Sequence, residues 1–139
     1  MPDVLSAIGV VQMGRVEEIA QKRQAIAALY NKAFTNIKGL VTPITASDRT
    51  HVYHQYTLRV TSEFKMTRDE FKNYLTEKGI GSNVYYPRPL YEFPHLTSKN
   101  NPALFPVTHK AKDEVLSLPV HPGLTEENIK YIIETICNA

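Results

Sequence analysis

The sequence contains little cysteine and no tryptophan, and it lacks the long apolar runs of a membrane protein. Cys137 is the single cysteine, so no disulfide forms within the chain, and one unpaired thiol is typical of a reducing cytoplasm. No apolar run approaches the roughly 20 residues that span a bilayer. The first residues also lack the basic start and apolar stretch of a secretory signal. These absences predict a soluble, cytoplasmic protein with no membrane partner.

The chain also has no large excess of positive or negative charge. The 16 lysines and arginines and the 14 acidic residues give a formal charge of +2, and the basic residues are scattered along the chain. A nucleic-acid-binding surface needs clustered lysine and arginine, so we expect no nucleic-acid partner. A length of 139 residues is that of one domain that can bury a core of ordinary size.

No reaction centre is recognisable from the residues alone. His51 and His54 lie three apart in a predicted strand and therefore point to opposite faces, so they could not chelate one metal ion together. Cys137 lies in a predicted terminal helix, and neither a nucleophilic serine motif nor a glycine-rich phosphate loop is present. For His121, which lies between two prolines, a bond to a nearby carbonyl is favoured over a catalytic role. We predict no catalytic residue and no metal site.

A long amphipathic helix is expected at the N-terminus. Apolar residues recur mostly three, four or seven apart from Val4 to Phe34, which predicts a helix over about residues 3–36 with a length of roughly 50 Å. Gly9 and Gly14 each cost about 1 kcal/mol relative to alanine, which indicates a compensating close contact. Either packing within the domain or an interface with another domain or subunit would supply it.

The rest of the chain predicts a small sheet covered by helices. Residues 37–51 are expected to form a connecting loop. Strand formers and turn residues, capping boxes and apolar spacing predict strands at 51–60, 84–86 and 115–119, and helices after Thr67, over 106–114 and after Thr125. In the first strand, His54, Tyr56, Leu58 and Val60 would share one face. This order of elements predicts an α+β fold with a small antiparallel sheet.

Residues 79–91 carry the densest set of groups that could touch a ligand. Gly79 and Gly81 permit a sharp change of chain direction, and Pro87 and Pro89 hold Arg88 in an extended conformation. Three tyrosines and this arginine could stack on and hydrogen-bond to a polar ligand. On these residues alone, a sheet edge followed by a surface loop is favoured over a ligand-binding loop.

Four stretches together resemble the DegT/DnrJ/EryC1/StrS family, in order and over essentially the whole chain. They are residues 3–12, the strand that begins His51-Val52-Tyr53-His54, residues 79–90 with Tyr86-Pro87-x-Pro89-Leu90, and Phe105-Pro106-Val107 followed by residues 116–125. The resemblance implies part of a pyridoxal-phosphate (PLP) dependent aminotransferase of the aspartate-aminotransferase fold. Such enzymes move an amino group from an amino acid, typically glutamate, to a nucleotide-linked keto sugar, and they work as homodimers.

The resemblance also implies a division into domains. Residues 1–36 would link a large PLP-binding domain, which would lie upstream of Met1, to a small C-terminal α+β domain at 37–139. The lysine that forms the Schiff base would then be outside this chain. We therefore expect that PLP belongs to the parent enzyme, that none binds this chain alone, and that the chain alone is inactive.

The resemblance suggests which residues line the substrate side of the cleft. These are Tyr85, Tyr86, Arg88 and Tyr91, with His54 nearby, and Arg88 would bind a phosphate or a carboxylate. Tyr91 stands where the family often has histidine, which affects the choice of sugar. The alternative is a non-enzymatic interaction or oligomerisation module derived from the same family.

Overall fold

A computed structural model describes residues 2–96 and 102–139. In this part of the chain there are five α-helices, three strands and two short 3₁₀ helices. The α-helices are α1 (Asp3–Met13), α2 (Val16–Phe34), α3 (Arg68–Glu77), α4 (Pro106–Glu114) and α5 (Glu126–Cys137). The strands are β1 (Leu40–Val41), β2 (Tyr56–Val60) and β3 (Val115–Leu118), and the 3₁₀ helices are η1 (Leu90–Glu92) and η3 (Pro102–Leu104).

The three strands form one antiparallel sheet in the order β1-β2-β3. Leu58 of β2 is opposite Leu116 of β3, and Val60 is opposite Leu40 of β1. The predicted alternation along β2 is confirmed, because Tyr56, Leu58 and Val60 are buried while the residues between them are partly exposed. The α+β class and the antiparallel sheet are therefore confirmed.

Aromatic side chains hold α2 and the sheet together. Tyr30 and Phe34 of α2 are stacked with their ring centroids 5.5 Å apart, and Tyr30 meets the edge of Tyr56 at 5.1 Å. Both phenols are satisfied, since Tyr30 Oη donates to the carbonyl of Pro119 at 2.9 Å and Tyr56 Oη donates to Asn31 at 2.8 Å. Burial raises the pKa of both tyrosines, so they stay neutral and act as hydrogen-bond donors inside the core.

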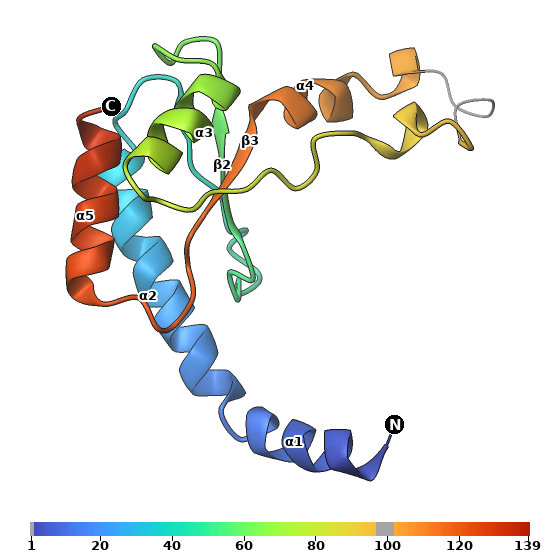
Figure 1. The fold of residues 1–139 in the computed structure, drawn as a ribbon, viewed down its shortest axis with the longest axis vertical. Coiled ribbons are helices and arrows are strands. Elements are labelled where there is room, and N and C mark those ends of the chain that lie inside the picture. Colours follow the sequence, from blue (N-terminus) through green and yellow to red (C-terminus); the bar gives the residue numbers. More distant parts are fainter. Residues whose placement is uncertain (1, 97–101) are drawn as a thin grey trace.

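The predicted N-terminal helix is divided in two. Helix α1 ends at Met13 with Gly14 in the C-cap position, and Arg15, with a φ of −109°, precedes α2 without a side-chain capping hydrogen bond. Glycine and the absence of packing around it explain the break, because an α-helix gains most of its stability from a buried face. Helix α2 buries four residues and lies beside α5, whereas α1 buries none and extends away from the sheet (Figure 1).

The ends of α3 and α5 follow the sequence signals. Thr67 with Glu70, and Thr125 with Asn128, each form a capping box at the first turn. Gly79 follows α3 with a φ of +73°, as expected of a glycine that ends a helix. Both predicted helix starts are confirmed.

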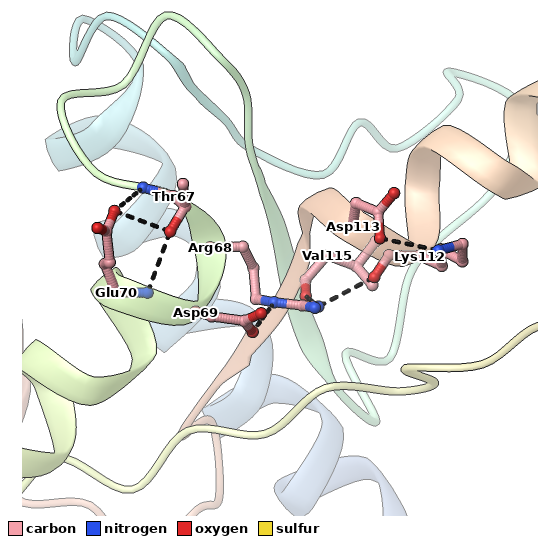
Figure 2. Close-up of polar contacts among 7 residues, drawn as sticks. All are labelled: Thr67, Arg68, Asp69, Glu70, Lys112, Asp113 and Val115. Atoms are coloured by element: carbon pink, nitrogen blue, oxygen red, sulfur yellow. Dashed lines mark hydrogen bonds and ion pairs between the residues drawn. The ribbon is translucent and has the colours of Figure 1, made fainter.

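A buried arginine joins the start of α3 to the junction between α4 and β3 (Figure 2). Arg68 has 8% of its surface exposed, and its Nη1 donates to the carbonyls of Lys112 at 3.0 Å and Val115 at 3.1 Å. Its Nε forms an ion pair with Asp69 at 2.7 Å. A cation at the last carbonyls of a helix also interacts favourably with the helix dipole. This contact fixes the position of α4, which borders one of the cavities described below.

The sequence assigned three segments wrongly. The predicted strand over 51–60 begins only at Tyr56, because Tyr53 has a φ of +46° and a positive φ is incompatible with a strand. Residues 84–86 form no strand, and the sheet contact of this segment is a single bridge between Asn83 and Ser117. The structure instead has β1 inside the predicted loop, and two residues are too few to show alternation.

In the described residues, no helix has both the length and the hydropathy needed to cross a membrane.

Candidate functional site

Two cavities meet at Tyr85. The first, which we call the basic cavity, has a volume of about 360 Å³ and is lined by Arg23, His54, Gln55, Gly81, Ser82, Asn83, Tyr85, Ser117, Leu118, Pro119, Val120 and His121. The second, which we call the aromatic cavity, has a volume of about 550 Å³ and is lined by Tyr85, Tyr86, Pro87, Arg88, Pro89, Leu90, Phe93, Thr108, Ala111, Lys112 and Val115. Segments far apart in the sequence therefore converge on one tyrosine.

A fixed turn brings His54 to the basic cavity. Arg23 of α2 donates from Nη1 to the carbonyls of Tyr53 at 3.0 Å and His54 at 2.8 Å, and the neighbouring Gln24 donates to the carbonyl of His51 at 3.1 Å. The amide of Tyr53, the residue with positive φ, donates to His51 Nδ1 at 2.8 Å. A non-glycine residue in this conformation persists only where its surroundings hold it, and here the side chains of α2 do so.

The other wall of the basic cavity is formed by the segment around Asn83 where it pairs with β3. The backbones of Asn83 and Ser117 exchange two hydrogen bonds, at 3.1 and 2.8 Å. The side-chain amide of Asn83 donates to Tyr85 Oη at 3.1 Å, which orients the phenol that both cavities share. Ser82 Oγ is buried and has no hydrogen-bond partner among the described residues. A buried hydroxyl without a partner is costly, so this wall has an unused donor and acceptor.

The loop after Tyr85 forms the aromatic cavity. Tyr85 and Tyr86 meet edge to face with centroids 5.8 Å apart, and the side chain of Tyr86 is largely exposed. Arg88 follows between two prolines and lines the same cavity. In Figure 1 this segment (yellow) leaves the sheet and runs out beside α4 (orange). Three of the residues predicted to line the substrate cleft, Tyr85, Tyr86 and Arg88, thus border one cavity.

Tyr91 has a different environment from the other predicted substrate residues. Its ring is 5% exposed and is stacked on Phe105 with centroids 5.6 Å apart, and its Oη lies 3.2 Å from His109 Nδ1. His109 belongs to α4, so Tyr91 fastens the loop to that helix. His54 and Tyr85 line the basic cavity, and Tyr85, Tyr86 and Arg88 line the aromatic one.

Sequence reasoning missed Arg23, Gln55 and Asn83, and it favoured a turn role for His121, which lines the basic cavity. Arg23 has the spacing of an ordinary exposed helix residue, and no local pattern shows that residues 53 and 54 fold back against it. For His121 a signal did exist, since two prolines and a glycine surround it and restrict its position.

The lysine that borders these cavities is poorly suited to forming a Schiff base. Among the described residues that line them, the one lysine is Lys112, whose Nζ bonds Asp113 at 3.0 Å. That hydrogen bond, with further attraction from Asp113 and Glu92, raises the pKa of Lys112 above its ordinary value. A lysine that forms a Schiff base must react as the neutral amine. Lys112 is therefore a poor fit for a covalent PLP anchor.

The match to a family model defines the class of protein, a domain of an aminotransferase family. The model of the DegT/DnrJ/EryC1/StrS aminotransferase family matches residues 1–137, and the chain belongs to this family, as the sequence motifs suggested.

Two curated relatives illustrate the match. A pleiotropic regulatory protein of Geobacillus stearothermophilus is 35% identical over 139 residues, which cover 98% of this chain and 36% of the relative. A UDP-2-acetamido-2-deoxy-3-oxo-D-glucuronate aminotransferase of Pseudomonas aeruginosa is 35% identical over 122 residues, which cover 88% of this chain and 32% of the relative. The chain thus spans about a third of the length of these relatives.

Solved structures agree with this result. The chain superposes on DesV of Streptomyces venezuelae with a TM-score of 0.87 and 26% identity, over 95% of this chain and 34% of that one. It superposes on the PLP form of the putative sugar aminotransferase Spr1654 of Streptococcus pneumoniae with a TM-score of 0.87 and 25% identity, over 99% of this chain and 35% of that one. The predicted fold class and family are therefore confirmed.

Proposed function

We propose that this chain is the substrate-binding domain of a PLP-dependent aminotransferase that transfers an amino group from an amino acid to a nucleotide-linked keto sugar. The observation that carries the proposal is the meeting of two cavities at Tyr85, one polar with Arg23 and two histidines, and one apolar with exposed aromatic surface. A nucleotide sugar has the matching parts, namely hydroxyls and phosphates on one side and a flat base on the other. The name of the Pseudomonas relative, a UDP-sugar aminotransferase, supports this substrate class.

The proposed roles follow from the surroundings of each residue. Tyr86 offers its exposed ring for stacking on a base or sugar, and Tyr85, oriented by Asn83, donates or accepts a hydrogen bond between the cavities. His54 and Arg88 supply polar contacts on either side. Tyr91 acts on the substrate indirectly, because its bond to His109 holds the loop on α4.

When bound, PLP would supply the electron sink for amino transfer. Lys112, the lysine among the described residues that line these cavities, is hydrogen-bonded to Asp113, which raises its pKa and favours its charged form, so we propose that these residues do not provide the covalent anchor. We therefore propose that the anchor lies in the part of the parent enzyme that corresponds to the remaining two thirds of the relatives. This chain binds substrate without reacting with it.

We further propose that residues 1–36 connect this domain to the rest of the parent, which works as a homodimer, and that residues 37–139 form the small domain. The support is the contrast between α2, whose buried face packs on the domain, and α1, whose apolar residues are exposed. The same exposure favours the alternative function, an interaction module that assembles through α1. A relative named as a regulatory protein is compatible with that alternative.

Paired assays of amino transfer test the proposal. A protein that carries this domain together with the remaining two thirds is expected to aminate a UDP- or dTDP-linked keto sugar with glutamate, whereas this chain alone is expected to be inactive and to show no cofactor absorbance after dialysis. An intact protein that aminates no nucleotide sugar, combined with stable self-association of this chain, would favour the interaction module. A cofactor absorbance band that survives dialysis of the 139-residue chain would contradict the proposal that the covalent PLP anchor lies outside it.

A further inference from the structure

Residues 85–88, which we call the tyrosine loop, are attached to the domain at both of their ends. They are exposed, border the aromatic cavity and form no helix or strand. Before them, the backbones of Asn83 and Ser117 exchange two hydrogen bonds, at 3.1 and 2.8 Å, which join the segment to β3. After them, Pro89 and Tyr91 are buried. The course of the tyrosine loop therefore depends on the positions of its two attachment points.

The second attachment point is made by one face of α4. The ring of Tyr91 is stacked on Phe105, the residue before α4, with centroids 5.6 Å apart, and its Oη lies 3.2 Å from His109 Nδ1. A carboxylate oxygen of Glu92 lies 3.8 Å from His109 Nδ1 and 3.8 Å from Lys112 Nζ. Residues three apart in a helix are neighbours on its surface, so the histidine and the lysine hold η1 together.

The two attachment points belong to one continuous stretch of chain. Helix α4 ends at Glu114 and β3 begins at the next residue, Val115, so no linker separates them. The first attachment point is on β3 and the second is on α4. A chain spans at most about 3.3–3.6 Å per residue, so a segment as short as the tyrosine loop cannot absorb a large change in the distance between its ends. The angle at which α4 meets β3 therefore determines the course of the loop.

Arg68 of α3 holds α4 and β3 together at this junction (Figure 2). Its Nη1 donates to the carbonyl of Lys112 on the helix side at 3.0 Å and to the carbonyl of Val115 on the strand side at 3.1 Å. The side chain is 8% exposed. Arg68 is absent from the described lining of the aromatic cavity and borders a different cavity, together with Lys110 and Glu114. It can therefore affect the tyrosine loop only through α4 and β3.

We propose that Arg68 is a positioning residue for the tyrosine loop. By joining α4 to β3 it sets the separation of the two attachment points, and thereby the places of Tyr86 and Arg88 at the aromatic cavity. A guanidinium group suits this task because its N–H donors form a rigid planar fork that can serve two carbonyls at once. The role of the loop in substrate binding rests on the proposed function, whereas the connection between Arg68 and the loop does not.

NMR relaxation of the 139-residue chain tests the connection without a ligand. In Arg68→Met the backbone order parameters of Tyr86 and Arg88 should fall toward the range of flexible chain, below about 0.6, while those of β2 stay near 0.85. Arg68→Lys keeps the charge and a donor but loses the fork, so it should restore the loop in part. Ile136→Ala is the control for lost stability, because it leaves a cavity beneath α5 and should not change the order of the loop.

A double-mutant cycle shows whether Arg68 acts through α4. His109→Ala removes the contact with Tyr91 and should loosen the loop by itself, whereas His109→Asn keeps an acceptor bonded to Cγ, as Nδ1 is, and should preserve more of the order. Because both residues act on one attachment point, Arg68→Met should add little to His109→Ala. If Arg68→Met does not fold, Arg68→Lys replaces it in the cycle and should give a smaller change in the same direction.

The consequence for the reaction is measured in a protein that carries this domain together with the remaining two thirds. Arg68→Lys should raise KM for a UDP-linked keto sugar roughly 2- to 30-fold, the range for residues that act on a ligand from a distance, with kcat nearly unchanged.

An equally ordered loop in the parent sequence and in the Arg68 variants, or fully additive effects in the cycle, would overturn the inference. Loss of loop order without any amino transfer by the intact protein would refute the proposed function and would still support the role of Arg68 in positioning the loop.

Discussion

Helices α1 and α5 have nearly the same length, 11 and 12 residues, and both are rich in apolar side chains, yet their environments are opposite. Helix α5 buries Ile129, Ile132, Thr135 and Ile136 against the domain. Helix α1 has no buried residue, and its exposed large apolar side chains are Val4, Leu5, Ile8, Val10, Val11 and Met13. The apolar residues of α5 are three or four apart and share one face, whereas those of α1 are spread around the helix. A helix that is apolar on all sides is normally covered by protein, so α1 depends on a partner that α5 already has.

The largest difference between the two helices is expected from the same substitution made in each. Ile136 is 1% exposed and Ile8 is 53% exposed. Ile136→Ala should lower the free energy of unfolding by about 2–5 kcal/mol, because a cavity is left in the core, and Ile8→Ala should change it by less than about 0.5 kcal/mol. Urea denaturation of the two variants measures this. Equal effects would mean that α1 is packed in this chain and would invalidate the contrast.

The second largest difference is expected between two arginine substitutions, one at the packed start of α3 and one at the break between α1 and α2. Arg68→Met should lower the free energy of unfolding by about 2 kcal/mol, because the carbonyls of Lys112 and Val115 lose a charged donor in a buried place. Arg15→Met, at the break between α1 and α2, should cost about 0–1 kcal/mol, since its pair with Glu18 is exposed. Thermal unfolding followed by circular dichroism compares them. A larger loss for Arg15 would contradict the description of α1 as an unpacked extension.

Helix caps give a smaller difference. Thr125→Ala should lower the free energy of unfolding by about 1 kcal/mol, since the threonine hydroxyl accepts a hydrogen bond from the backbone N–H of Asn128 at the start of α5. Helix α1 has no side-chain cap. Ser6→Ala, which removes only an exposed bond to the carbonyl of Pro2, is the matched control and should be nearly neutral. Denaturant midpoints of the two variants should therefore separate, and coinciding midpoints would show that the cap of α5 adds no stability.

The smallest effect is a pH dependence at the start of α3. Hydrogen bonds from the Thr67 backbone amide and hydroxyl hold the pKa of Glu70 below its ordinary value of 4.5. A lowered pKa in the folded state means that Glu70 stabilises the fold above its ordinary pKa and that this contribution disappears as the pH falls through the lowered value. Carboxyl ¹³C shifts should report the low pKa, and Thr67→Ala, which removes the hydroxyl and keeps the backbone amide, should move it part of the way back toward 4.5. An unchanged titration in that variant would separate the shift from the cap.

The parts of the fold that depend on local signals were predictable. Thr67 and Thr125 identified two helix starts, and the alternation of Tyr56, Leu58 and Val60 identified the buried face of β2. Prediction failed where distant contacts decide the backbone. The positive φ of Tyr53 is held by Arg23 and His51, and no pattern within residues 51–60 indicates this.

The candidate site likewise has residues that local sequence signals indicate and residues that only distant contacts bring to it. Residues 85–88 stand out in the sequence because aromatic side chains and an arginine are concentrated around prolines. Arg23 does not stand out, because its role comes from a turn about 30 residues further along the chain. The substrate contact of Tyr91 stays a prediction, and what the sequence did not indicate is that its ring is stacked on Phe105 and its hydroxyl contacts His109.

The sequence by itself determined the family, the α+β class, the helix caps and the loop with the tyrosines, because each depends on residue type and spacing along a short stretch. The tertiary structure alone decided that the first helix breaks at Gly14, that Arg23 and His54 border one cavity, and that Tyr85 lies between two cavities. The physical reason is that a side chain's partners are chosen by the packing of elements distant in sequence. The backbone then adopts whatever conformation those partners can hold.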